Sequence, residues 1–413
     1  MHGVKANRMS SRAQDRSTDR SAAGSTTESA PAGPALRRTL SFPLLTLYGV
    51  GTMVGGGFYA LIGKVAGQAG LAAPLSFVVA ATVALFSALT LGSLAARFPR
   101  SGGPAHYVGA VFRRPSWATT TGWAVIATGA VSAGTLIVAF VGFVQDITPL
   151  PAWVGVSTLT LALCAIASWG VSESVKVAVV ITLIEVGGLF YVVYMALSRG
   201  DLAGSLAWPE FTALAAPGVW FGAVLSFYAF VGFEDVVTMA EETEDASRNV
   251  PRAILWSLGI TTGLYVVVSV VTLAAVPLGE LSRSHTPLAL VVAGHGRLAQ
   301  VAMGVVSMVA GVNGALMQII MGSRIIHGMA SQGTAPASWG VVSPRTQTPI
   351  RATIIVGAVA WGLAMWFPLE SLARVTSAVL LAVFLAMHIT LLKMRRQDGA
   401  PTGGTTWSPS WAW

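Results

Sequence analysis

Runs of about 20 apolar residues recur ten times along the chain, and this recurrence constrains the fold more than any other feature. An α-helix needs about 20 residues to cross the ~30 Å hydrocarbon core of a bilayer. We therefore expect an all-α polytopic protein embedded in a lipid bilayer, with ten transmembrane helices. The predicted spans 1 to 10 are residues 42–63, 73–95, 117–144, 152–170, 174–198, 218–241, 252–276, 298–326, 350–367 and 371–392.

The composition excludes a soluble protein of this length. Of the 413 residues, 54% are hydrophobic and only 10% are charged, whereas soluble proteins carry about 25% charged residues. So few charges cannot cover so much apolar surface in water. The single cysteine, Cys164, rules out an internal disulfide and a cysteine metal cluster. We expect neither a metal nor another cofactor.

Basic residues alternate between the two sides of the predicted membrane domain. The segments predicted to lie outside hold only Lys64, Arg199, Arg283, Arg297 and Arg374, and the other 20 of the 25 Lys and Arg residues fall in the inside segments. Basic loops mark the cytoplasmic side, so we expect a multi-pass protein of the cell membrane with both termini in the cytoplasm. This distribution accounts for the net charge of +8 without nucleic acid as a partner.

Two tails flank the membrane domain. Residues 1–38 are rich in Ser, Thr, Ala and Arg and contain no aromatic residue, which is typical of a disordered segment. We expect residues 39–393 to form the ten-helix core and residues 394–413 to form a short cytoplasmic tail. The sequence predicts no oligomeric state.

Two spans contain interruptions. Gly55, Gly56 and Gly57 stand together in span 1, and three such residues cost a continuous helix about 3 kcal/mol relative to alanine. Span 6 carries Phe227-Tyr228-Ala229-Phe230-Val231-Gly232-Phe233-Glu234-Asp235, a glycine and two acids inside an apolar run. Unwound backbone at membrane depth is tolerated only where protein buries it or where it lines a cavity.

The two interruptions occupy corresponding positions, because span 1 opens the first five spans and span 6 opens the second five. Such a pair indicates the binding site of an inverted-repeat transporter. Other interpretations stay open at each position: close packing of small residues at the three glycines, and a simple kink at Val231–Gly232.

Broken helices offer both charges that an α-amino acid needs. The N–H groups and positive dipole end of a half-helix suit a carboxylate, and we assign this role to Gly55, Gly56 and Gly57. Carbonyl groups left free where a half-helix ends suit an ammonium group, and we assign this role to Phe230, Val231 and Gly232. The site would therefore bind a zwitterionic amino acid.

Four motifs, in the same order, resemble those of the amino acid–polyamine–organocation (APC) permeases. They are the glycine-rich span 1 with Leu61-Ile62-Gly63, the loop Ala96–Gly103, span 6 with Glu241-Glu242 and Arg248–Ala253, and Ser323-Arg324 with Met329-Ala330. The resemblance covers residues 40 to 392. It implies a LeuT-type 5+5 inverted repeat with helices 1 and 6 discontinuous, secondary amino acid transport, and an aromatic gate at Tyr228. The alternative for Tyr228 is a packing role alone, which is common for aromatic residues in membrane helices.

Glu185 lies in the middle of span 5, where a charged carboxylate costs at least ~2.5 kcal/mol. Sodium-independent relatives carry a lysine in this region that is thought to replace a sodium ion. We interpret Glu185 as a proton-coupling group. The alternative is a structural carboxyl group that is hydrogen-bonded between helices.

Glu234 and Asp235 follow directly on the interruption in span 6. They either cap the first N–H groups of the second half-helix, or one of them contacts a cationic substrate side chain. The sequence offers no other clear acid for such a side chain, so neutral or apolar amino acids are favoured.

These observations predict a secondary active transporter that moves amino acids by alternating access, with proton symport or substrate exchange. No motif of an enzyme or of an ATP-driven pump is found. The alternative is an amino acid receptor that uses the same site without transport, in which the N-terminal tail would contact a partner.

Overall fold

The computed structural model describes residues 40–98, 103–146, 148–169, 175–198, 208–331, 333–346 and 348–398. The expected tail of residues 1–38 lies outside these ranges, as does most of the tail expected from residue 394, although the last helix continues to Gln397. Within the described ranges the chain is helical, and its one strand-like feature is an isolated bridge between Leu40 and Thr243.

The helices follow the predicted spans closely. In chain order they are α1 (Phe42–Val54), α2 (Gly57–Ala69), η1 (Gly70–Ala72), α3 (Ala73–Arg97), α4 (Gly103–Phe112), α5 (Pro115–Gln145), α6 (Ala152–Trp169), α7 (Val175–Leu197), η3 (Phe211–Ala215), α8 (Pro217–Tyr228), η4 (Phe233–Glu242), α9 (Ala246–Ala275), α10 (Leu278–Arg283), α11 (Pro287–Val292), η5 (Ala293–His295), α12 (Arg297–Ser331), η6 (Ala337–Trp339), α13 (Ile350–Trp366) and α14 (Leu369–Gln397).

Each of the ten predicted spans contains helix within the residues that the structure describes. By length and composition, eight helical stretches of the described chain can cross a membrane, and one of them, Gly57–Arg97, joins the second half of span 1 to span 2. Two shorter apolar helices, Phe42–Val54 and Ile350–Trp366, supply the first half of span 1 and span 9. The other eight spans are α3, α5, α6, α7, α8 with η4, α9, α12 and α14.

Span 1 is discontinuous, as the three glycines predict. α1 ends at Val54 and α2 begins at Gly57. Between them Gly55 has an extended conformation, with φ −45° and ψ 177°. The first turn of α2 therefore presents N–H groups that have no acceptor within the helix.

Span 6 is discontinuous at the corresponding place. α8 ends at Tyr228, and the chain continues after Gly232 as the 3₁₀-helix η4. Gly232 has φ +122°, and a Cβ on it would stand 2.5 Å from the carbonyl oxygen of Thr52. This position therefore needs glycine for its backbone angle and for its contact with span 1.

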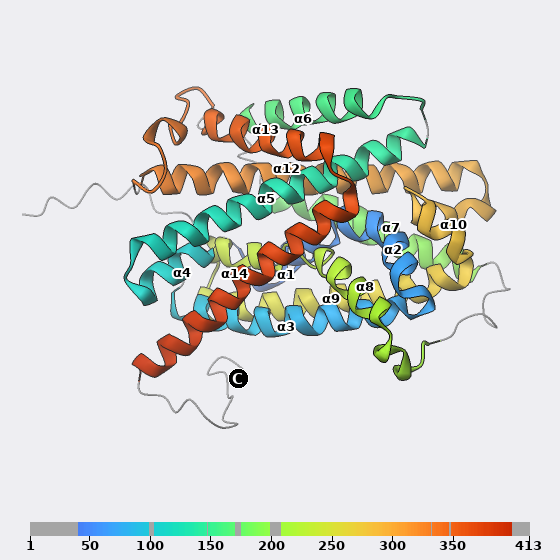
Figure 1. Ribbon diagram of the computed structural model, residues 1–413, viewed down its shortest axis with the longest axis horizontal. Coiled ribbons are helices and arrows are strands. Elements are labelled where there is room, and N and C mark those ends of the chain that lie inside the picture. Colours follow the sequence, from blue (N-terminus) through green and yellow to red (C-terminus); the bar gives the residue numbers. More distant parts are fainter. Residues whose placement is uncertain are drawn as a thin grey trace, which may run out of the picture. The chain divides into compact units, whose positions relative to one another are not determined.

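In four of the five pairs, the corresponding spans of the two halves pack against each other. In span order, α2 packs on α8 and α1 on η4, α3 packs on α9, α5 on α12, and α6 on α13. Figure 1 shows α5 running beside α12, and α3 beside α9. The two halves of span 1 thus contact the two halves of span 6, and these contacts bring the two breaks together.

We expect Gly232→Ala to lower the melting temperature of the purified protein. The substitution places a Cβ at a positive φ against the backbone of span 1, which costs about 1–3 kcal/mol. The matched control is Gly263→Ala in α9, where a Cβ meets nothing within 4 Å and helix propensity improves by up to about 1 kcal/mol. Equal melting temperatures for the two variants would contradict this account.

Candidate functional site

Tyr265 of α9 lies between the two broken helices. Its hydroxyl oxygen is 2.7 Å from the carbonyl oxygen of Met53 and 2.8 Å from that of Ala229. These carbonyls belong to the ends of α1 and α8, where helical hydrogen bonding stops. The hydroxyl of Tyr265 is fully buried and has one proton to donate, and it lies within hydrogen-bond distance of a carbonyl oxygen at each break.

A second contact joins the breaks directly. The hydroxyl of Thr52 lies 2.9 Å from the carbonyl oxygen of Gly232 and 3.0 Å from that of Gly49. The N–H of Asp235 also donates to the Gly232 carbonyl, at 3.0 Å. The carbonyl of Gly232, one of the three expected to receive an ammonium group, is therefore already engaged within the protein.

The structure separates the three glycines of span 1, to which the sequence assigned one role. A Cβ on Gly56 would stand 2.6 Å from the Cα of Gly311 in α12, so this glycine allows two backbones to touch. A Cβ on Gly57 would stand 3.1 Å from the ring of Tyr228, and one on Gly55 would meet nothing closer than 3.8 Å. Close packing thus accounts for Gly56, and Gly55 has the most open surroundings of the three.

Tyr228 packs against α5. Its hydroxyl lies 3.0 Å from the Oγ of Ser132 and 3.1 Å from the Ser132 carbonyl oxygen, and the side chain is buried. Phe230 is buried against the ring of Tyr265, with the ring centroids 5.2 Å apart. Val231 is also buried and lies in the irregular segment between α8 and η4.

Glu185 of α7 is fully buried beside the first break. One carboxylate oxygen lies 3.5 Å from the side-chain nitrogen of Asn313 in α12. The other oxygen has no hydrogen-bond partner within the described part of the chain. The backbone carbonyl of Glu185 accepts a hydrogen bond from the hydroxyl of Tyr59 in α2. Glu185 therefore contacts both span 1 and span 8.

Glu234 and Asp235 are both buried beside the second break. A carboxylate oxygen of Glu234 accepts the N–H of Gly232 at 2.9 Å. This contact satisfies the N–H of the residue that precedes η4, as one half of a capping box does, and within the described residues η4 has no side-chain cap on its own first N–H groups. Asp235 contributes its backbone N–H to the same segment.

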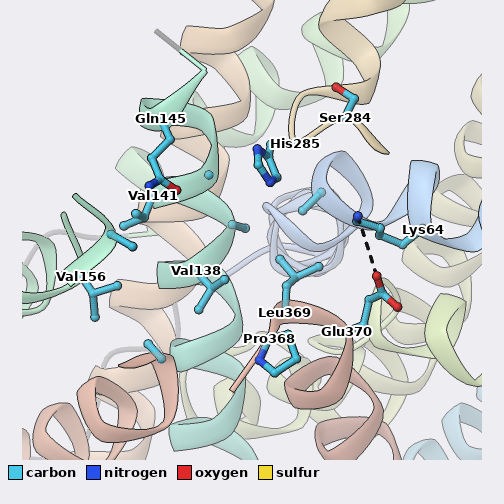
Figure 2. Close-up of a pocket in the computed structure, with 15 residues that line it drawn as sticks. Lys64, Val138, Val141, Gln145, Val156, Ser284, His285, Pro368, Leu369 and Glu370 are labelled. Atoms are coloured by element: carbon cyan, nitrogen blue, oxygen red, sulfur yellow. Dashed lines mark ion pairs between the residues drawn. The ribbon is translucent and has the colours of Figure 1, made fainter. Parts of the chain in front are cut away.

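A cavity of about 270 Å³ lies between α2, α5, α6, the segment joining α10 to α11, and the start of α14 (Figure 2). Lys64 borders it, with its Nζ 3.7 Å from a carboxylate oxygen of Glu370 and 3.1 Å from the carbonyl oxygen of Ser282. His285 also lines the cavity, and its Nδ1 lies 3.1 Å from a carboxylate oxygen of Asp146.

Sequence reasoning missed several polar residues of this site. Thr52, Tyr265 and Asn313 are polar residues within apolar spans. The polar side chain at such a position was the only feature of the sequence that could have identified them as site residues. For Lys64 the sequence predicted only a charge on the outer side of the membrane. Glu370 was not singled out, since a carboxylate at a span end is commonplace.

Comparisons with known proteins agree on a family. The amino acid permease family profile matches residues 40–412. The chain is 27% identical to the branched-chain amino acid permease BcaP of Bacillus subtilis over 390 residues, which are 88% of this chain and 82% of that protein. It is 31% identical to the cationic amino acid transporter 4 of Homo sapiens over 396 residues, but spans only 61% of that protein.

A solved structure shares the fold. The crystal structure of MhsT in complex with L-phenylalanine superposes with a TM-score of 0.61 at 15% identity, covering 91% of this chain and 95% of that one. MhsT has the LeuT fold, so the expected inverted repeat with two discontinuous helices is confirmed.

We expect Gly56→Ala to destabilise the protein more than Gly55→Ala. The first variant forces α2 and α12 apart, and such overpacking costs about 1–3 kcal/mol. The second adds a methyl group at ordinary contact distance. Thermal melting of both variants in detergent measures the difference, and a larger loss in Gly55→Ala would refute the packing role given to Gly56.

Proposed function

Because the chain belongs to the amino acid permease family, we propose that it is a secondary active transporter that carries an amino acid across the cell membrane by alternating access. The observation that supports this most directly is the meeting of two helix breaks around Tyr265 and Thr52. The charge distribution along the sequence supports cytoplasmic placement of both termini.

The substrate backbone binds between the two breaks in this proposal. Its carboxylate accepts N–H groups at the start of α2, beside Gly55 and Gly57, where the helix dipole favours negative charge. Its ammonium group meets the carbonyls of Phe230 and Val231. The Gly232 carbonyl contributes less than expected, because Thr52 and Asp235 already donate to it.

A neutral or apolar substrate side chain suits these surroundings better than a cationic one. One carboxylate oxygen of Glu234 accepts the N–H of Gly232, and both Glu234 and Asp235 are buried, so the described structure presents no exposed carboxylate at the break to a cationic side chain. The buried rings of Tyr228 and Phe230 provide apolar surface next to the break. The names of BcaP and the ligand of MhsT point the same way, whereas other relatives are named for cationic amino acids.

Alternating access requires contacts that can open. We assign the moving part to spans 1, 2, 6 and 7, where α3 packs on α9 and on α8, and α1 packs on α9. Tyr228 bonded to Ser132, and Lys64 paired with Glu370, both link this part to the remaining spans. Both contacts would separate when the substrate enters from the outer side.

A proton on Glu185 provides the coupling in this proposal. A charged carboxylate deep in a membrane protein costs at least ~2.5 kcal/mol, and one oxygen of Glu185 is buried without a described partner. Protonation removes that cost. As part of this proposal, the substrate binds best while Glu185 is neutral.

The decisive experiment is counterflow in proteoliposomes loaded with unlabelled amino acids. We expect labelled substrate to accumulate, with the substrate chosen beforehand by thermal shift against the twenty amino acids. Acidification of the interior during net uptake indicates symport, and a strict need for internal substrate indicates exchange. Binding without any flux would overturn transport and favour a receptor.

We expect Glu185→Gln to flatten the pH dependence of counterflow, because glutamine resembles the protonated acid and cannot titrate. Wild-type activity should fall as the pH rises and Glu185 ionises, whereas the variant should keep its activity. The control is Glu280→Gln in α10, an acid outside the membrane-spanning helices. An unchanged profile in Glu185→Gln would remove Glu185 from coupling.

A further inference from the structure

Asn313 lies between the two parts of the proposed site. Its side-chain nitrogen is 3.5 Å from Glu185, and it belongs to the sequence Gly311-Val312-Asn313-Gly314 of α12. This turn of α12 also packs on the break in span 1, because a Cβ on Gly56 would stand 2.6 Å from the Cα of Gly311. One helical turn thus contacts the buried carboxyl group on one side and the glycines of the break on the other.

Glu185 is also connected to the far side of that break. The hydroxyl of Tyr59, three residues beyond Gly56 in α2, donates to the Glu185 backbone carbonyl. The carboxyl group and its amide partner therefore lie within a closed loop of contacts among α2, α7 and α12. A change at the carboxyl group has a short structural route to the N–H groups of α2.

Few other titratable groups face Glu185 within the described chain. They are the phenols of Tyr59 and Tyr265. α7 packs on α1, α9, α11 and α12. α1 and α11 contain no charged residue, and the charges of α9 and α12 stand toward the helix ends: Arg248, Arg252, Arg297 and Arg324.

We propose that Asn313 is a positioning residue that couples the protonation of Glu185 to substrate affinity. This inference rests on the proposed function. The amide N–H of Asn313 donates to the carboxylate form, whereas a protonated Glu185 can itself donate to the amide oxygen. When Glu185 changes from acceptor to donor, the side-chain amide of Asn313 turns to present its oxygen. This reorientation shifts the turn of α12 that packs against Gly55 and Gly56. The affinity of the α2 N-terminus for the substrate carboxylate changes with it.

The test compares the KM for counterflow at about pH 5.5 and about pH 8. In the wild type we expect a several-fold ratio of KM between the two conditions, in line with typical coupling between sites. Asn313→Ala should bring this ratio close to one while leaving the maximal exchange rate within about twofold. The control Ser307→Ala removes a hydroxyl of α12 that bonds only to its own helix, at Met303, and should keep the wild-type ratio.

The double variant Glu185→Gln/Asn313→Ala separates coupling from independent damage. If the two residues act as one unit, its KM ratio equals that of either single variant. Asn313→Ser retains a small hydrogen-bond donor and should recover part of the KM ratio. This variant keeps the test valid if Asn313→Ala fails to fold. A wild-type ratio in both Asn313 variants, or additive effects in the double variant, would overturn the role of Asn313. Absence of counterflow in the wild type would instead refute the proposed function.

Discussion

The need to satisfy backbone polar groups away from water governs this structure. A broken membrane helix exposes carbonyl and N–H groups that hydrocarbon cannot solvate. Here Tyr265 serves the carbonyls of Met53 and Ala229, Thr52 bonds to Gly232, and Glu234 accepts the Gly232 N–H. Each break is thus stabilised by the other and by α9. The N–H groups at the start of α2 have no side-chain cap within the described chain, and this arrangement of the two breaks fixes their position.

Much of the fold could be predicted from the sequence, because its signals are local. Ten apolar runs set the spans, and three adjacent glycines in span 1 and Gly232 in span 6 marked the breaks at the correct residues. The site was harder, because its contacts join residues far apart in the chain. Thr52 and Gly232 are 180 positions apart, and Met53 and Tyr265 are 212 apart. No local pattern specifies such pairs.

The three glycines of span 1 show why the roles of single residues could not be predicted from the sequence. Their sequence context is nearly identical, yet Gly56 touches the α12 backbone, Gly57 leaves room for the Tyr228 ring, and Gly55 has open surroundings. Which surface a residue faces at a helix break depends on backbone angles that change from one position to the next. Glu185 shows the opposite case, because a lone acid in an apolar span is conspicuous in sequence, although its amide partner is not.

The contact between Gly56 and Gly311 has a mechanical consequence. Two backbones that meet without side chains between them form a narrow point of support, around which one helix can tilt without dragging interlocked side chains past each other. Larger side chains at these two positions would interdigitate and oppose rotation of one helix against the other. Span 1 therefore touches α12 backbone to backbone at the level of its break, and this contact opposes tilting less than interlocked side chains would.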